Sequence, residues 1–526
     1  MKKAGIKALA CFSVFASGGF WGIPASAQDM TAPLDDATLF GGPTDLVTVI
    51  DTATAAAGTI ELVKDTKTYP VFLLEGDVAA GMKGAVTAYG TTTAGTPNLF
   101  GAVNLGSLSI DFLPARNLNF NIAVDATLLP TDVKDLSVSA YADLRASEFT
   151  RFYAAGSYNY NISSNANSLV TVNDGFSLDE IFVDTAIGRK IFFRLGKQRV
   201  SWGVGNWYKP ADVLSLSQID PDNPTASREG PFAFKTDMPF GLLNHATLYM
   251  VPPIDGDPSK FSIAERTDVV IGGFELSFAG FARTDMQAKP RLMFMFSGAI
   301  GSFDVYGENV MAWGSDRTYV RAKAGGTGYE IYAIENYPVF QSTLGIKYSW
   351  QNSDGLSADL HVQGYYNGTG YQDSSILQIV AARSAIVNSD TYTSNDLVQA
   401  GMYYLAGSIS LGARFGEGSK LVNTTLGSTA LVNFSDMSMR FKPAWSLTIG
   451  SGGSTLKLNL SALTSIGNAK SEYAPNGNMV TPDLSVTILK SVVASVNTPL
   501  RLNPDFSLNK ASINFSLYWN VVSFQN

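Results

Sequence analysis

Apolar and polar residues alternate along most of the chain, in short segments that are separated by turn-forming residues. Leu108, Ile110 and Phe112 occupy every second position of one such segment, with polar residues between them. The same alternation recurs in the segments 118–128, 136–144, 151–162 and 511–524. Because successive side chains of a strand point to opposite faces, each segment predicts a strand with one apolar and one polar face.

A three-residue connection, Gly188–Lys190, separates two of these alternating segments and predicts a β-hairpin. With Ile187 facing Ile191, two further pairs of residues meet on the polar face: Asp184 with Arg194, and Glu180 with Gln198. Opposite charges across neighbouring strands favour this register.

A second hairpin is predicted around the turn Gln351–Gly355. Its expected register places three pairs opposite one another: Lys347 with Asp359, Gly345 with His361, and Thr343 with Gln363. Trp350 lies beside this short turn, as expected of an aromatic residue at a membrane interface.

The N-terminus has the pattern of a secretory signal peptide, residues 1–27, with a basic start, an apolar stretch and a small-residue cleavage site. Its removal takes away three lysines and changes the formal charge from −8 to −11. The only cysteine, Cys11, is lost with it, so disulfides are not expected. Residues 28–68 are polar and turn-rich and predict a periplasmic lead-in, with a plug or docking segment as the alternative.

Residues 69–526 contain no uninterrupted run of about 18 apolar residues, the length that predicts a membrane-spanning helix. An exported, cysteine-free chain of alternating segments instead predicts an all-β fold, a transmembrane antiparallel up-and-down β-barrel. We expect about 18 strands, within roughly 16–20, with short periplasmic turns and long external loops. The location would be the outer membrane of a diderm bacterium. The expected partners are outer-membrane lipid, periplasmic chaperones, the barrel assembly machinery and a small solute.

Known enzyme motifs are missing from the chain, and its two histidines, His245 and His361, both fall in predicted strands. We therefore expect no enzymatic activity, no cofactor and no metal site. The acidic balance argues against nucleic acid as a partner. Asp220–Asn223 has the residue types of a calcium loop, although such a sequence is more often a turn.

Polar residues on the inward faces of the strands are candidates for lining the lumen. They are Asp143, Arg151, Glu180, Asp184, Arg194, Gln198, Lys347, Asp359 and His361. They would either sort solutes by charge or pair with one another to satisfy a polar interior.

A long connection, Gly203–Gly230, follows the first hairpin and is the candidate constriction. The residues singled out are Trp202, directly before this connection, and Trp207, Tyr208, Lys209, Asp212 and Arg228 within it. The segment would fold inward and narrow the lumen, or form an ordered lid on the outer surface. The apolar stretch Ile376–Val387 is too short to span a membrane and predicts a plug or a segment packed over the barrel mouth.

Leu195–Gly203, with Lys209–Val213 after it, resembles the Gly-[Arg/Lys]-Gln-x-x-x-Trp-Gly … Pro-x-Asp pattern of alginate-export-type and related porin-like outer-membrane barrels. The resemblance implies a single-chain channel of about 18 strands with a polar lumen. With the mixed inward charges, it favours a channel for diffusion of small hydrophilic solutes. The alternatives are a transporter of hydrophobic molecules such as fatty acids, and a surface adhesin or structural barrel with a closed lumen.

Overall fold

The computed structural model describes residues 71–525 apart from short gaps. These gaps are 90–92, 95–97, 116–117, 129–132, 148, 165–169, 189, 242, 254–259, 286–287, 327, 394–395, 417–420, 451–455, 489–491, 499 and 503–507. The predicted signal peptide and the lead-in therefore lie outside the described residues.

Strands make up most of the described chain. In order they are β1 (Val71–Tyr89), β2 (Thr93–Ala94), β3 (Asn98–Ala115), β4 (Leu118–Leu128), β5 (Val133–Arg145), β6 (Arg151–Ser164), β7 (Val170–Ile187), β8 (Ile191–Lys197), β9 (Phe232–Pro239), β10 (His245–Val251), β11 (Ser262–Ile271), β12 (Phe274–Arg283), β13 (Arg291–Ile300), β14 (Phe303–Trp313), β15 (Thr318–Ala322), β16 (Tyr329–Ala333), β17 (Pro338–Gln351) and β18 (Leu356–Asn367). After the 3₁₀ helix η2 (Ser374–Gln378) and helix α3 (Val380–Val387) come β19 (Tyr403–Phe415), β20 (Val422–Asn433), β21 (Ser438–Ile449), β22 (Leu456–Ile466), β23 (Met479–Ile488), β24 (Val492–Asn497), β25 (Leu500–Leu502) and β26 (Leu508–Gln525).

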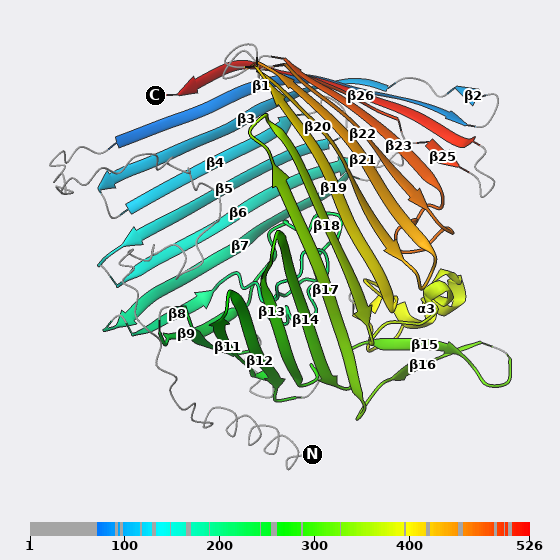
Figure 1. The fold of residues 1–526 in the computed structure, drawn as a ribbon. Helices are drawn as coiled ribbons and strands as arrows, with labels where there is room; N and C mark the ends of the chain where they lie inside the picture. The colour runs from blue at the N-terminus through cyan, green and yellow to red at the C-terminus, as the bar shows by residue number, and fades with distance from the viewer. Residues whose placement is uncertain are drawn as a thin grey trace.

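One antiparallel sheet contains all the strands except β15 and β16, which form a separate hairpin. Successive long strands are hydrogen-bonded neighbours, and β1 pairs with β3 on one side and with β26 on the other. The first and last strands therefore lie side by side, as the blue and red ribbons in Figure 1 show. An antiparallel sheet that returns to its first strand is an up-and-down barrel, and the predicted fold class is confirmed.

The sheet contains 24 described strands, more than the eighteen or so expected from sequence, although β2 and β25 are only two and three residues long. Part of the difference lies between β8 and β14, where each strand has only 7 to 11 residues. Gly272 and Gly273 alone connect β11 to β12, and both have positive φ angles. So tight a turn leaves room for more strands in the same length of chain.

The outward face of the sheet is apolar. Side chains in the middle of the strands are exposed there, including Leu344, Ile346, Leu360, Ile409 and Leu426. Exposed aromatic residues flank this belt: Phe303, Trp350 and Phe415 at one end of the strands, and Trp313, Tyr366 and Tyr403 at the other. An apolar band between two girdles of aromatic residues is typical of the outer surface of a membrane-embedded barrel. Within the described part of the chain, no helix is long and apolar enough to cross a membrane.

The inward face carries buried polar side chains, among them Asp184, Glu308, Thr343 and Gln363. Part of it is covered by the segment 198–231, which enters from one end of the barrel. We call this the long-loop end, because the segments 198–231, 314–337, 368–402 and 467–478 all connect strands there. The opposite, short-turn end has brief connections such as Gly188–Lys190 and Asn352–Gly355.

The first predicted hairpin has the expected register. Ile187 pairs with Ile191 and Asp184 with Arg194. The ladder ends at Ile181–Lys197, so the expected pairing of Glu180 with Gln198 does not form.

The second hairpin keeps its predicted faces but shifts its register by two residues. Lys347 pairs with His361, while Asp359 lies opposite Ser349. The other two expected pairs shift in the same way: Gly345 pairs with Gln363 instead of His361, and Thr343 pairs with Tyr365 instead of Gln363. The cause is the side chain of Asn352, whose Oδ1 accepts hydrogen bonds from the backbone N–H groups of Asp354 (3.1 Å) and Leu356 (2.7 Å). The turn therefore begins one residue later than expected.

Candidate functional site

The connection between β8 and β9, residues 198–231, packs against the inward face of the barrel, and we call it the inner segment. Val200, Trp202, Ala211 and Leu214 belong to one buried cluster with apolar side chains of β9 to β14. Trp202 meets the ring of Tyr249 at 5.7 Å in an edge-on arrangement. The predicted motif around Trp202 therefore turns the chain inward, where its apolar residues are buried against the wall.

Two side chains of the wall hold the backbone of the inner segment. The carboxylate of Glu308, on β14, accepts hydrogen bonds from the N–H groups of Gly205 (2.6 Å) and Ala211 (2.9 Å). The two hydrogen bonds to Glu308 fix both ends of the stretch Gly205–Ala211, since a buried backbone N–H needs a partner. The second wall side chain is Gln363, and neither it nor Glu308 has any exposed surface.

Gln363, on β18, makes the remaining contacts to this stretch. Its Oε1 accepts from the N–H groups of Asn206 (3.0 Å) and Trp207 (2.9 Å), and its Nε2 donates to the carbonyl of Tyr208 (2.7 Å) and to Oγ1 of Thr343 (2.6 Å). The amide thus uses both its oxygen and its nitrogen to hold three consecutive residues.

Gly203 explains why the motif has a glycine directly after its tryptophan. Its φ is +85°, and a Cβ there would lie 2.6 Å from Oε1 of Glu308. Any larger residue would both strain the backbone and displace the carboxylate that anchors the segment.

Trp207 and Tyr208 add aromatic contacts to β18 and to the loop 467–478. The Trp207 ring lies 4.5 Å from that of His361, whose Nε2 is 2.6 Å from the hydroxyl of Tyr306. Tyr208 is fully buried, stacks on Tyr365 at 5.0 Å and shares a 2.7 Å hydrogen bond with the hydroxyl of Tyr473. Burial raises the pKa of the Tyr208 phenol well above its usual value.

The charged residues predicted for the constriction stabilise the inner segment internally. Asp212 forms an ion pair with Arg228 and also accepts hydrogen bonds from Ser215 (3.0 Å) and the N–H of Trp202 (3.4 Å). Burial raises the pKa of Asp212, with Arg228 opposing the effect, and burial lowers the pKa of Lys209. The structure brings Trp202, Asp212 and Arg228 into contact, whereas Trp207 and Tyr208 belong to a separate buried cluster.

The predicted lumen residues of β5 to β8 form two bidentate ion pairs. Arg194 donates to Asp184 through Nε (2.6 Å) and Nη2 (3.0 Å), and its guanidinium lies 4.0 Å from the centre of the Phe182 ring. Arg151 donates to Asp143 at 2.9 Å and 3.1 Å. In this part of the wall, the cations and anions pair with one another.

The other predicted lumen residues are scattered. Glu180 accepts from the N–H of Arg199 (3.1 Å), while the buried amide of Gln198 donates to the carbonyl of Ala233 (3.1 Å). Lys347 and Asp359 are both exposed near the short-turn end. No ion pair joins them among the described side chains.

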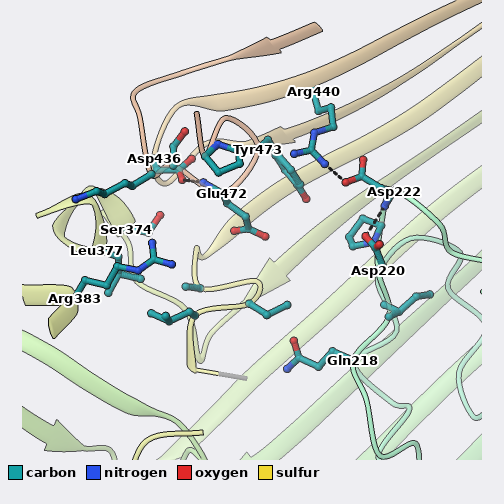
Figure 2. Close-up of a pocket in the computed structure, with 18 of the residues that line it drawn as sticks. Gln218, Asp220, Asp222, Ser374, Leu377, Arg383, Asp436, Arg440, Glu472 and Tyr473 are labelled. Carbon is teal, nitrogen blue, oxygen red and sulfur yellow. Dashed lines mark hydrogen bonds and ion pairs between the residues drawn. The ribbon is translucent and has the colours of Figure 1, made fainter. Parts of the chain in front are cut away.

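A cavity of about 570 Å³ opens at the long-loop end, and Figure 2 shows the side chains that surround it. Four separate segments line it: Leu216–Asp222 of the inner segment, residues 374–400 around α3, Asp436 and Arg440 at the start of β21, and Lys470–Pro475. The cavity was not predicted, because four loops that are distant in sequence build it.

Two segments noted in the sequence analysis contribute to this cavity. Asp220–Asn223 is a turn, in which the N–H of Asn223 donates to the carbonyl of Asp220 (3.0 Å) and the N–H of Asp222 donates to Oδ1 of Asp220 (3.0 Å). Ile376–Val387 is helical in large part, and Leu377, Ala382 and Ile386 pack against Val320 of β15. These contacts are to the β15–β16 hairpin and to neighbouring loop residues, and the two predicted roles of the segment stay predictions.

Glu472 lies in this cavity, outside the strands. Its Oε2 accepts hydrogen bonds from the Tyr404 hydroxyl (2.7 Å) and the Asn433 amide (3.0 Å). Burial raises the pKa of Glu472 to about 7, with Asp436 acting in the same direction and Arg317 in the opposite one.

The raised pKa of Glu472 predicts a pH dependence for the loop 467–478. Because the folded loop favours the protonated acid, its contribution to stability is complete below the usual glutamate pKa and is lost as the pH rises through about 7. Amide hydrogen exchange of this loop should therefore show weaker protection at pH 8 than at pH 5, after correction for intrinsic rates. Glu472→Gln should flatten this difference, and Glu335→Gln, at an exposed site, should not. An unchanged pH dependence in Glu472→Gln would contradict the prediction.

Comparisons with known proteins give no family. No protein-family model matches the chain, and no curated protein does so. The resemblance of Gly196–Gly203 to alginate-export-type barrels therefore stays a prediction.

Similar solved structures do exist. A variant of the ferric enterobactin receptor PfeA of Pseudomonas aeruginosa is 10% identical, with a TM-score of 0.39 over 85% of this chain and 80% of the receptor. OccAB1 of Acinetobacter baumannii is 10% identical, with a TM-score of 0.37 over 85% of this chain and 97% of that protein. OccAB4 of the same organism is 7% identical, with a TM-score of 0.35 over 86% and 98% of the two chains.

Proposed function

We propose that this protein is an outer-membrane channel through which small hydrophilic solutes diffuse, and that the inner segment constricts its lumen. The observation that carries the proposal is the anchoring of Gly205–Ala211 on the inward face by Glu308 and Gln363. A segment bound at both ends inside a barrel would narrow the path of a solute through the lumen, and no other domain would be needed. The signal peptide would deliver the chain to the periplasm, with the short-turn end remaining on that side.

The pairing of charges on the wall indicates how the lumen would treat ions. Asp143 with Arg151 and Asp184 with Arg194 neutralise each other within bidentate contacts. A wall of paired charges has no net electrostatic potential of one sign. It would therefore favour polar solutes and discriminate only weakly between cations and anions.

Single-channel recording tests the proposal. Residues 28–526, refolded and inserted into a planar bilayer, should give steady steps with a linear current–voltage relation. The reversal potential in a potassium chloride gradient should lie close to zero. The same preparation after boiling serves as the control. Silent bilayers from protein shown to be folded and inserted would overturn the channel assignment and favour the closed-barrel alternatives.

A further inference from the structure

The cavity at the long-loop end is distinct from the anchors of the inner segment. It lies beyond Leu214 along that segment, and neither Glu308 nor Gln363 lines it. Its volume falls within the range of about 300–1,000 Å³ that is usual for small-molecule sites. Several loops enclose it, so a ligand would contact side chains from all of them.

Part of the charge around the cavity is already paired within the protein. Arg440 forms an ion pair with Asp222, drawn as a dashed line in Figure 2. Asp436 accepts hydrogen bonds from the Ser438 hydroxyl (2.6 Å) and from the N–H of Glu472 (2.9 Å). These groups hold the loops together and are not free to bind a ligand.

The remaining cations are Arg383, on α3, and Lys470. Neither has an ion pair or a side-chain hydrogen bond within the described part of the chain. Arg383 is only partly exposed, and Figure 2 shows its guanidinium directed toward the open centre, close to Ser374. A partly buried guanidinium without a carboxylate is a receptor for an anionic group.

The remaining anions are Glu472 and Asp220. Glu472 accepts hydrogen bonds from the neutral groups of Tyr404 and Asn433, and no described cation forms an ion pair with it. Figure 2 shows its carboxylate directed into the same open centre as Arg383. Arg383 and Glu472 therefore face the same cavity, and neither forms an ion pair within the described part of the chain.

The uncharged part of the lining is mixed, with polar side chains such as Gln218 and Ser374 beside several apolar ones. Leu216, Leu377, Leu397 and Val398 come from two of the four segments, and the side chains of Leu216 and Val398 are more than 40% exposed. Such surface would cover the hydrocarbon part of a ligand whose charged ends are held elsewhere.

We propose that this cavity binds a small zwitterion of the amino-acid or short-peptide class, with its carboxylate at Arg383 and its ammonium at Glu472. A ligand with both charges would pair with Arg383 and Glu472 at once, whereas a singly charged ligand would pair with one and leave the other desolvated. This inference concerns equilibrium binding and does not require that the barrel conducts.

Binding of L-leucine and of L-leucyl-L-leucine to the detergent-solubilised full chain tests the proposal, by isothermal titration calorimetry at pH 8. At least one of them should bind saturably. Two analogues of leucine lack one charge each: 4-methylpentanoate has no ammonium, and 3-methylbutylamine has no carboxylate. If leucine binds, each analogue should bind at least about tenfold more weakly. If only the dipeptide binds, 4-methylpentanoyl-leucine and leucyl-leucinamide take their place.

Arg383→Gln and Glu472→Gln should each weaken binding by a similar factor of about ten or more. Arg321→Gln is the matched control, because Arg321 pairs with Glu330 in the β15–β16 hairpin and does not line the cavity. Each variant is first shown to be folded by its heat-dependent shift on a gel. Absence of saturable binding, equal binding of a singly charged analogue, or full binding by Arg383→Gln would each overturn the proposal. Binding in a preparation that gives no conductance would overturn the channel assignment alone.

Discussion

The double variant Glu308→Ala, Gln363→Ala is expected to give larger and noisier conductance steps than the natural chain. Glu308→Ala removes the acceptor of two buried N–H groups, and Gln363→Ala removes the acceptor of two more. A buried donor left without a partner costs about 1–3 kcal/mol, so the stretch Gly205–Ala211 should leave the wall for much of the time. The lumen widens whenever it does.

Single-channel recordings and limited proteolysis together check this expectation. The freed stretch should also become accessible to a small protease added from the long-loop side. Asn309→Ala is the matched control, because Asn309 is the next residue on β14 but is exposed on the opposite face, where it contacts Ser342 (2.8 Å). Unchanged steps in a double variant whose inner segment is cut by protease would show that this segment does not limit conduction.

Asp184→Ala is expected to destabilise the barrel by about 3–5 kcal/mol, the usual effect of breaking a buried ion pair on one side. Asp184 is 2% exposed and Arg194 6% exposed, so water cannot replace the lost carboxylate. The guanidinium would stay between the wall and the Phe182 ring without this bidentate partner. Urea unfolding of the protein in lipid vesicles should show the midpoint at lower urea concentration.

Asp143→Ala provides the comparison, because its pair with Arg151 has the same bidentate geometry but more exposed side chains, 12% and 16%. Its effect should be clearly smaller. The double change Asp184→Leu, Arg194→Met should restore much of the stability lost in Asp184→Ala, since no charge is then buried. Equal losses in Asp143→Ala and Asp184→Ala would show that burial does not set the strength of these pairs.

The sequence was sufficient for the fold class and for the faces of the strands, because the period of two is a local property. It was also sufficient for the register of the first hairpin, where a short turn and complementary charges agree. It failed by two residues at the second hairpin, since the side chain of Asn352 decides where that turn begins. The strand number was underestimated where strands are short and turns are tight.

The candidate site was predictable only in part. The motif at Gly196–Gly203 and the aromatic residues after it pointed to an inward segment. Neither Glu308 nor Gln363 was predicted to anchor it, because both lie on other strands, more than 90 residues away in sequence. Nothing local distinguishes these two from other polar residues on inward faces. The cavity at the long-loop end was even harder to predict from sequence, since it exists only where four loops meet.

The inner segment is covalently joined at both ends to strands that are hydrogen-bonded neighbours, β8 and β9. In the proposed channel it would act as a tethered blocker, whose release is not a dissociation. Once detached, it remains near its anchors at an effective concentration on the order of millimolar, as short flexible tethers do. Reclosure is then a unimolecular step whose rate is independent of protein concentration. The inner segment also cannot be removed by washing, because it is part of the chain. Openings should occur as bursts that end spontaneously, and a change at the anchors would lengthen the bursts rather than leave the lumen permanently open.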